Sequence, residues 1–233
     1  MEKSWTRDGH VFQFSAANFH WEVNPQRAEL GAELFESKTS EKIGGIFGLP
    51  ALAKSAVNEA EIYIRQTDLI VRYAATEDRP VEISLMWRAS GDSIATLELI
   101  ISIQTALLDA QPIREVRSWF PHGSILPFTV VPAAVASSRQ FENADATSAE
   151  HRCLIRNGGR LFLMVVHPSD LNWMSLTSDS KHYKMSCKLR TDNMEKGVIR
   201  RLRMQFVVGT DDDLDAIRQA PESFLQSGLP LST

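Results

Sequence analysis

The sequence predicts a mostly β protein: a large antiparallel sandwich of about a dozen strands in two packed sheets, with a short C-terminal helical segment. Short runs of alternating apolar and polar residues recur along most of the 233-residue chain, as in half-buried strands. One longer run, residues 94–108, is apolar and rich in β-branched residues, which is typical of a central strand buried on both faces. Helical periodicity is confined to the C-terminal end, so the pattern does not fit an alternation of strands and helices.

The N-terminal third predicts a β-meander followed by an insertion. Alternation at 10–16 and 18–23 predicts the first strands, and 26–35 continues the series. A Gly-rich stretch then interrupts the pattern. We expect a helical or irregular insertion at about 38–58, with Pro50 in the first turn of a short helix.

The middle of the chain predicts further paired strands. Within 61–73 the apolar residues change from even to odd positions, which requires a bulge or a tight turn near 66–68. Strict alternation at 81–87 predicts a half-exposed strand that leads into the central run. Prolines interrupt the periodicity between 109 and 149, so we expect only short edge strands there.

The C-terminal third predicts a hairpin, a final strand pair and the helix. The Asn-Gly-Gly-Arg sequence at 157–160 is a strong hairpin signal, and it follows a second insertion expected at about 132–150. Alternation at 181–190 and 196–208 predicts two strands that pair with each other. A threonine before three aspartates predicts a helix start, and we expect the helical segment at about 210–228.

Composition indicates a single soluble domain over residues 1–233, because no Pro, Gly or Ser linker marks a boundary. The net charge of −4 does not favour nucleic acid as a partner, and no apolar run is long enough for a membrane span. Cys153 and Cys187 are too few for a disulfide framework, so we expect free, buried thiols. With no apolar secretion signal at the start, this predicts a cytoplasmic protein.

Basic side chains give the first candidate binding surface. If the last two predicted strands pair, their basic residues share one face, which suits an anionic ligand such as a uronic acid or a phosphate. The alternative is ordinary solvated charge, since exposed strand faces commonly carry Lys and Arg. The residues concerned are Lys184, Lys188, Arg190, Arg201 and Arg203.

Aromatic side chains give the second candidate, because a sugar ring can stack its apolar C–H face on them. Trp119, His122 and Trp173 lie where we expect loops or strand ends, and binding residues concentrate in such places. Trp21 and Trp87 lie within predicted strands and are expected in the core.

No catalytic, metal or cofactor motif of high specificity occurs, since the six histidines form no HExxH, HxH or HxxxH pattern. We therefore expect no metal and no cofactor. His122 and His167, each beside a proline in a predicted loop, are candidate acid–base groups. Glu98 is a third candidate, because a carboxylate within a buried run has a perturbed pKa. The simpler explanation of Glu98 is an ion pair with Arg72 or Arg88 from a neighbouring strand.

Three functions are compatible with the sequence. The predicted fold is similar to the large supersandwich common among carbohydrate-active and carbohydrate-binding proteins, although a fold alone does not determine function. The first function is binding of a saccharide or another polar or anionic small ligand on a concave sheet face. The second is a carbohydrate-modifying enzyme of the epimerase or lyase type. The third is a non-catalytic subunit of a homo-oligomer.

Overall fold

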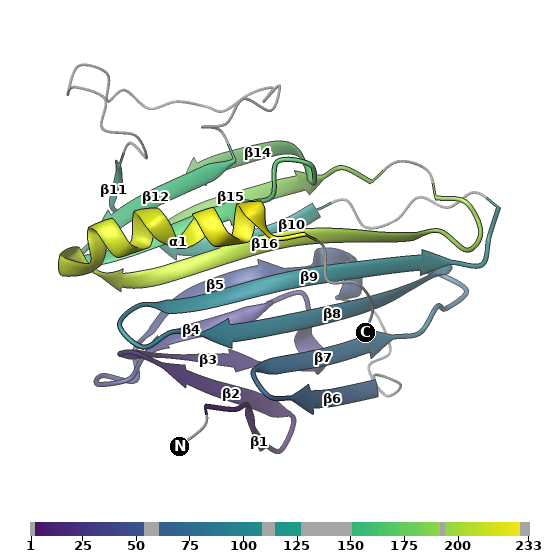
Figure 1. Cartoon of the computed structure of the whole chain (residues 1–233), viewed down its shortest axis with the longest axis horizontal. Helices are drawn as coiled ribbons and strands as arrows, with labels where there is room; N and C mark the ends of the chain where they lie inside the picture. Colours follow the sequence, from purple (N-terminus) through teal and green to yellow (C-terminus); the bar gives the residue numbers. More distant parts are fainter. Residues whose placement is uncertain (1–2, 54–60, 109–114, 127–150, 192–193, 229–233) are drawn as a thin grey trace.

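The computed structural model describes residues 3–53, 61–108, 115–126, 151–191 and 194–228. Within these ranges the chain forms two antiparallel eight-stranded sheets that pack face to face, with one α-helix near the C-terminal end (Figure 1). The structure confirms the predicted two-sheet antiparallel sandwich. Within the same ranges, none of the helices combines the length and apolar character needed to cross a membrane.

The two sheets differ in how they draw on the chain. Sheet A joins the N-terminal meander to three later strands, whereas sheet B holds the middle of the chain and the last strand. The strands of sheet A, in spatial order, are β1 (Thr6–Asp8), β2 (Val11–Ala16), β3 (Phe19–Val23), β4 (Ala32–Glu36), β5 (Lys42–Gly48), β10 (Glu115–Pro121), β15 (His182–Leu189) and β14 (Leu171–Ser178). Those of sheet B are β11 (Ser124–Leu126), β12 (Arg152–Asn157), β13 (Arg160–Val166), β16 (Ile199–Thr210), β9 (Ala95–Thr105), β8 (Val81–Ser90), β7 (Asp68–Tyr73) and β6 (Glu61–Arg65).

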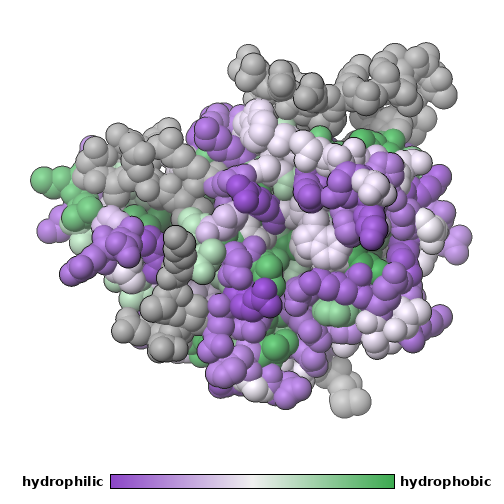
Figure 2. All heavy atoms as spheres, turned by 180° about the vertical axis from the view of Figure 1, so that it is seen from behind, coloured by the Kyte–Doolittle hydropathy of each residue, from purple (hydrophilic) through white to green (hydrophobic). Residues whose placement is uncertain are grey.

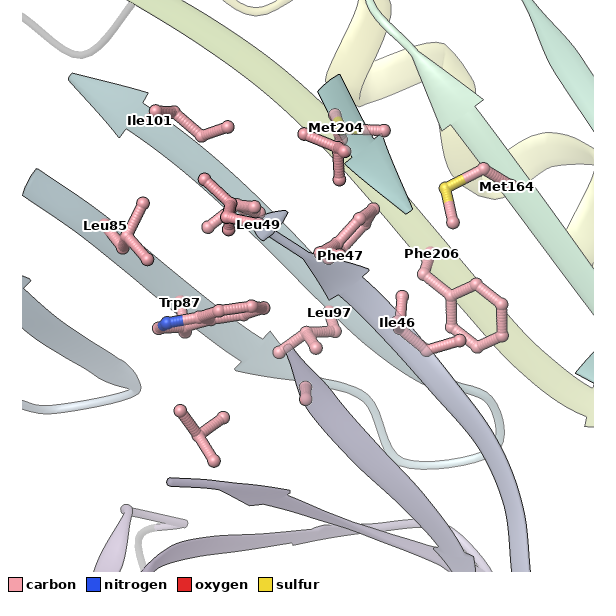
Figure 3. Packing of buried hydrophobic residues seen from close by; sticks show 14 of the residues in the cluster. Ile46, Phe47, Leu49, Leu85, Trp87, Leu97, Ile101, Met164, Met204 and Phe206 are labelled. Atoms are coloured by element: carbon pink, nitrogen blue, oxygen red, sulfur yellow. The ribbon is translucent and has the colours of Figure 1, made fainter. Parts of the chain in front are cut away.

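The facing sides of the sheets form one large hydrophobic core, because each strand directs alternate residues inward. Trp21 of sheet A and Trp87 of sheet B are both buried there, as expected. Figure 3 shows Phe47 of β5 among core residues of sheet B, and its ring centroid lies 6.2 Å from that of Trp87. The aromatic ring of Phe206 in β16 contacts Trp21 edge-on at 5.6 Å, so side chains of both sheets interdigitate.

The predicted central strand is β9, which lies between β16 and β8 in sheet B. Its inward residues, such as Leu97 and Leu99, are fully buried, whereas outward Gln104 is exposed. Burial on both faces is therefore reached at only part of the strand, around Ile100.

The helix α1 (Leu214–Gln226) covers the outer face of β13 and β16, where Ile217 and Phe224 pack on apolar residues of sheet B. The opposite side of the molecule, which Figure 2 shows, is largely hydrophilic with paler residues near its centre. That side carries the outer face of sheet A.

Three strand predictions are wrong, and a fourth, the strand expected at 26–35, forms only from Ala32 on as β4. Lys42–Gly48, expected within an insertion, forms β5 inside sheet A, because its glycines allow close approach of neighbouring groups. The region after residue 109, expected to hold only edge strands, contains β10 between β5 and β15; Pro121 is its last residue and interrupts no interior pairing. The last two predicted strands do not pair: β15 lies in sheet A and β16 in sheet B. Their connection at 190–198 is longer than the ~2–5 residues typical of a hairpin loop.

Several turns are confirmed. Gln66, with a φ of 54°, and Thr67 form the tight turn between β6 and β7. Gly158 and Gly159, with φ of 55° and 78°, form the hairpin turn between β12 and β13. Pro50 is the first residue of the 3₁₀ helix η2 (Pro50–Leu52). The expected insertion at about 132–150 lies outside the described residues.

The C-terminal helix begins as predicted. A second 3₁₀ turn, η4 (Asp211–Asp213), precedes α1, and both the Thr210 backbone N–H and its hydroxyl donate to the Asp213 carboxylate at 2.8 Å. The helix then continues through Pro221 as a single element. Near the other end of the chain, the 3₁₀ turn η1 (Pro25–Arg27) connects β3 to β4.

Candidate functional site

A row of outward-facing residues crosses sheet A at the level of Trp119. Residues directly opposite each other in neighbouring antiparallel strands point to the same face of a sheet. The row consists, from β2 to β14, of Gln13, Glu22, Glu33, Gly45, Trp119, Lys184 and Thr177. We call this row and the side chains that border it the Trp119 face.

The indole of Trp119 lies directly against the backbone of Gly45. A Cβ atom added at Gly45 would overlap the indole Nε1 and lie 2.8 Å from Cδ1. A Cβ at the neighbouring Gly44 would meet only ordinary contacts, the nearest being the Trp119 carbonyl oxygen at 3.4 Å. The absence of a side chain at Gly45 is therefore what lets the indole lie across β5.

Two side chains border this indole. The Lys42 Nζ lies 5.5 Å from the ring centroid, within the range of a cation–π contact, and the same ammonium pairs with Glu33. Burial, followed by the charge of Arg27, lowers the pKa of Lys42. The His182 ring approaches the indole edge-on, with centroids 5.0 Å apart. A ligand on the indole would therefore contact both donors and acceptors.

A carboxylate and a histidine extend the face towards β3. Glu22 accepts a 2.8 Å hydrogen bond from Gln13 Nε2, and its Oε1 lies 3.6 Å from His20 Nε2. The His20 ring stacks on Phe35 of β4, with centroids 4.9 Å apart. This part of the face combines an aromatic pair with groups that bind hydroxyls.

On the other side of Trp119, Lys184 pairs with Asp179 at 2.9 Å. The Asp179 carboxylate also accepts hydrogen bonds from the backbone N–H groups of Lys181 and His182, at 2.9 and 2.8 Å. These bonds, the one from Lys181 first, hold the pKa of Asp179 well below its usual value. Lys184 therefore faces a fixed negative charge.

The structure gathers several predicted ligand-binding residues on one surface. Trp119, Lys184, Lys188 and Trp173 all lie on the outer face of sheet A, and Trp173 stands opposite Lys188. Trp119 and Trp173 lie within strands, whereas loops or strand ends were expected. Whether these residues contact a ligand stays a prediction.

The expected shared basic face is not formed, because β15 and β16 belong to different sheets. Arg201 and Arg203 lie on sheet B. Arg203 is only 4% exposed; its Nη1 donates to the Ser227 carbonyl at 2.6 Å, and its guanidinium lies 5.7 Å from the Phe224 ring centroid. Its guanidinium thus holds the end of α1 against the sheet.

Neither of the two candidate histidines belongs to the row of residues through Trp119. His122 follows β10, is exposed, and stacks on Tyr183 with centroids 4.6 Å apart. His167 follows β13 on sheet B, where its Nδ1 lies 2.7 Å from Ser169 Oγ. Burial, followed by the charge of Arg203, lowers the pKa of His167.

Glu98 has the surroundings that its position predicted. It lies on the outer face of β9, and burial raises its pKa while Arg88 and then Arg203 lower it. The distance from Glu98 Oε2 to Arg88 Nη1 is 4.0 Å, so Arg88 is the expected neighbouring arginine. Arg88 also binds Asp68 through two hydrogen bonds of 2.8 and 3.1 Å.

Sequence reasoning did not single out several polar residues of the Trp119 face, among them Glu22, Glu33, Lys42 and His182. Glu22 alternates with the core residues Trp21 and Val23. This pattern predicts that Glu22 points outward, but it does not predict which residue of another strand lies beside it. Strand order decides which outward residues meet, and β10 joins the N-terminal meander through a pairing distant in sequence.

Within the described ranges, no group of three or more His, Cys, Asp or Glu residues could hold a metal ion. Cys153 and Cys187 are free and buried, as expected, and burial raises the pKa of Cys153 to about 12.

Comparisons with known proteins identify the fold but no family. No protein-family model and no curated protein matches the chain. Among solved structures, it is similar to a TPR-domain containing protein from Parabacteroides distasonis, with a TM-score of 0.52 and 9% identity over 96% of this chain and 49% of that one. A mutant of heparan sulfate lyase HepC from Pedobacter heparinus aligns with a TM-score of 0.51 and 7% identity, over 87% of this chain and 36% of that one. The chain thus spans half or less of the length of these proteins and shares their β-sandwich fold.

Proposed function

We propose that this chain binds a saccharide on the Trp119 face. The observation that carries the proposal is the Trp119 indole, which lies directly against Gly45 and is bordered by Lys42 and His182. Saccharides present an apolar C–H face beside many hydroxyls, so an aromatic ring among hydrogen-bonding groups matches their chemistry. The similarity to a heparan sulfate lyase supports the same class of ligand at the level of the fold alone.

A carbohydrate-modifying enzyme of the epimerase or lyase type is the second candidate. Two histidine–carboxylate pairs favour it: His20 and Glu22 at 3.6 Å, and His182 and Asp179 at 3.7 Å. Such pairs suit proton transfer next to a sugar bound on the indole. Turnover of a bound sugar that is lost in His20→Gln and His182→Gln, with binding retained, would establish this function.

We propose the cytoplasm as the location, on the basis of the two cysteines. Cys153 and Cys187 remain free thiols, as is usual in a reducing compartment.

The first experiment is a thermal-shift and calorimetric screen against neutral sugars, uronic acids and sugar phosphates at low and moderate salt. A ligand at 100 times its Kd stabilises the folded state by about 2.7 kcal/mol. Trp119→Ala should remove the shift. The matched control is Tyr63→Ala, which removes an exposed aromatic ring from sheet B and should leave the shift unchanged. No shift with any sugar, or a shift that survives Trp119→Ala, contradicts the proposal.

A further inference from the structure

We infer that the Trp119 face takes an extended, uncharged oligosaccharide chain and not a single sugar, an inference that rests on the proposed function. Its basis is a diagonal of three outward-facing aromatic residues across sheet A: Phe35 in β4, Trp119 in β10 and Trp173 in β14. All three are only partly buried, so each keeps surface that a sugar ring can contact.

The strand register gives the spacing on one side. Trp119 stands opposite Gly45 in β5, whereas Phe35 stands opposite Lys42 of the same strand. Phe35 therefore lies two strands away from Trp119, about 10 Å, and is displaced along the strands by a further ~7–10 Å. The displacement runs towards the C-terminal end of β10, because β5 and β10 are antiparallel.

The register on the other side gives the opposite displacement. Trp119 stands opposite Lys184 in β15, and Trp173 stands opposite Lys188 of that strand. Trp173 therefore also lies two strands away from Trp119. Along the strand direction it is displaced from Trp119 by four residues, or about 13 Å, towards the N-terminal end of β10. The three rings therefore lie on one diagonal about 30 Å long, which exceeds the length of a monosaccharide and requires a chain of several sugars.

The charges of the face indicate an uncharged chain. Basic residues near Trp119 are neutralised by carboxylates of the same face, so no excess of positive charge is left for a sulfated or uronic chain. A further base, Lys188, stands opposite Glu115, whose pKa is lowered first by Arg117 and also by the charge of Lys188. The ion pairs concerned are Lys42–Glu33, Lys184–Asp179 and Arg117–Glu115.

The test is calorimetry on the full chain with cello-, xylo- and manno-oligosaccharides of one to six units and a heparin-derived hexasaccharide at low salt. We expect affinity for one neutral series to rise at least tenfold from disaccharide to hexasaccharide. Phe35→Ala and Trp173→Ala should each weaken hexasaccharide binding roughly fivefold without changing disaccharide binding. Trp119→Ala should weaken both, and Tyr63→Ala neither.

The outcomes separate this inference from the proposed function. Equal affinity for short and long sugars in the unmodified protein, with sensitivity to Trp119→Ala, overturns the inference and retains the proposed function. Tighter binding of the heparin fragment than of every neutral chain also overturns it. Absence of binding to all these sugars overturns both. The length dependence needs no variant, so it stands even if a substitution impairs folding.

Discussion

Replacement of Gly45 by alanine tests how the Trp119 face is built, because it adds one methyl group where the indole lies. The new Cβ would overlap the indole Nε1 and lie 3.0 Å from Cε2, so Trp119 must move away from β5. Gly44→Ala is the matched control. It adds the same methyl group to the same strand, with Ile46 Cδ1 at 3.5 Å and Leu34 Cβ at 3.8 Å as ordinary neighbours.

The expected size follows from the contact area that a ligand loses. A tryptophan buries roughly 150–250 Å², and one face of the ring is about 80 Å² of that. At about 25 cal/mol per Å² this is ~2 kcal/mol of binding free energy, or about 30-fold in Kd. Gly45→Ala should therefore weaken saccharide binding about as much as Trp119→Ala, although the tryptophan is still present.

Two measurements check this prediction. Calorimetry gives Kd for each variant, and the indole N–H resonance of Trp119, assigned with Trp119→Phe, reports its position. Gly45→Ala should shift that resonance and weaken binding, whereas Gly44→Ala should change neither. Unchanged binding in Gly45→Ala, despite a shifted resonance, would refute the role given to the indole.

Three further predictions concern stability. Burial lowers the pKa of His151 to about 4, so the folded protein binds fewer protons at this residue than the unfolded protein does. The free energy of unfolding should therefore fall as the pH decreases from 6.5 to 4, by at most about 3 kcal/mol. Chemical denaturation of the unmodified protein and of His151→Gln isolates this effect as the difference between the two. Arg88→Met should lower the free energy of unfolding in urea by about 2 kcal/mol, because it leaves the buried Asp68 without its two hydrogen bonds from Arg88. The control, Arg72→Met, removes an exposed ion pair and should lower it by under ~0.5 kcal/mol. Equal decreases in the two variants would contradict the argument from burial. Thr210→Ala removes the hydroxyl bond at the start of η4 and should lower stability by about 1 kcal/mol, with Thr210→Ser restoring most of it.

Local patterns in the sequence predicted the elements whose causes are local. The change of apolar positions at 61–73 located the turn at Gln66, and the Asn-Gly-Gly-Arg sequence located the hairpin after Asn157. The apolar run that became β9 predicted its place in the middle of a sheet. Each of these depends on residues within a few positions of one another.

The candidate site depends on pairings that the sequence does not record. Gly45 and Trp119 are distant in sequence, and only the pairing of β5 with β10 brings them into contact. Alternation placed Lys184 and Arg203 on outward positions, but the choice of sheet put them on different faces of the molecule. The periodicity of one strand fixes which side chains share a face, whereas strand order fixes which of them meet.

The most direct test of the account is the Trp119 indole resonance during titration with the sugar that raises Tm most in the screen. If the proposal is right, this resonance shifts and saturates with the same Kd that calorimetry gives, while those of the core residues Trp21 and Trp87 stay in place. A titration that leaves the Trp119 resonance unchanged while sugar binds, or a screen in which no sugar binds, would contradict saccharide binding on the Trp119 face.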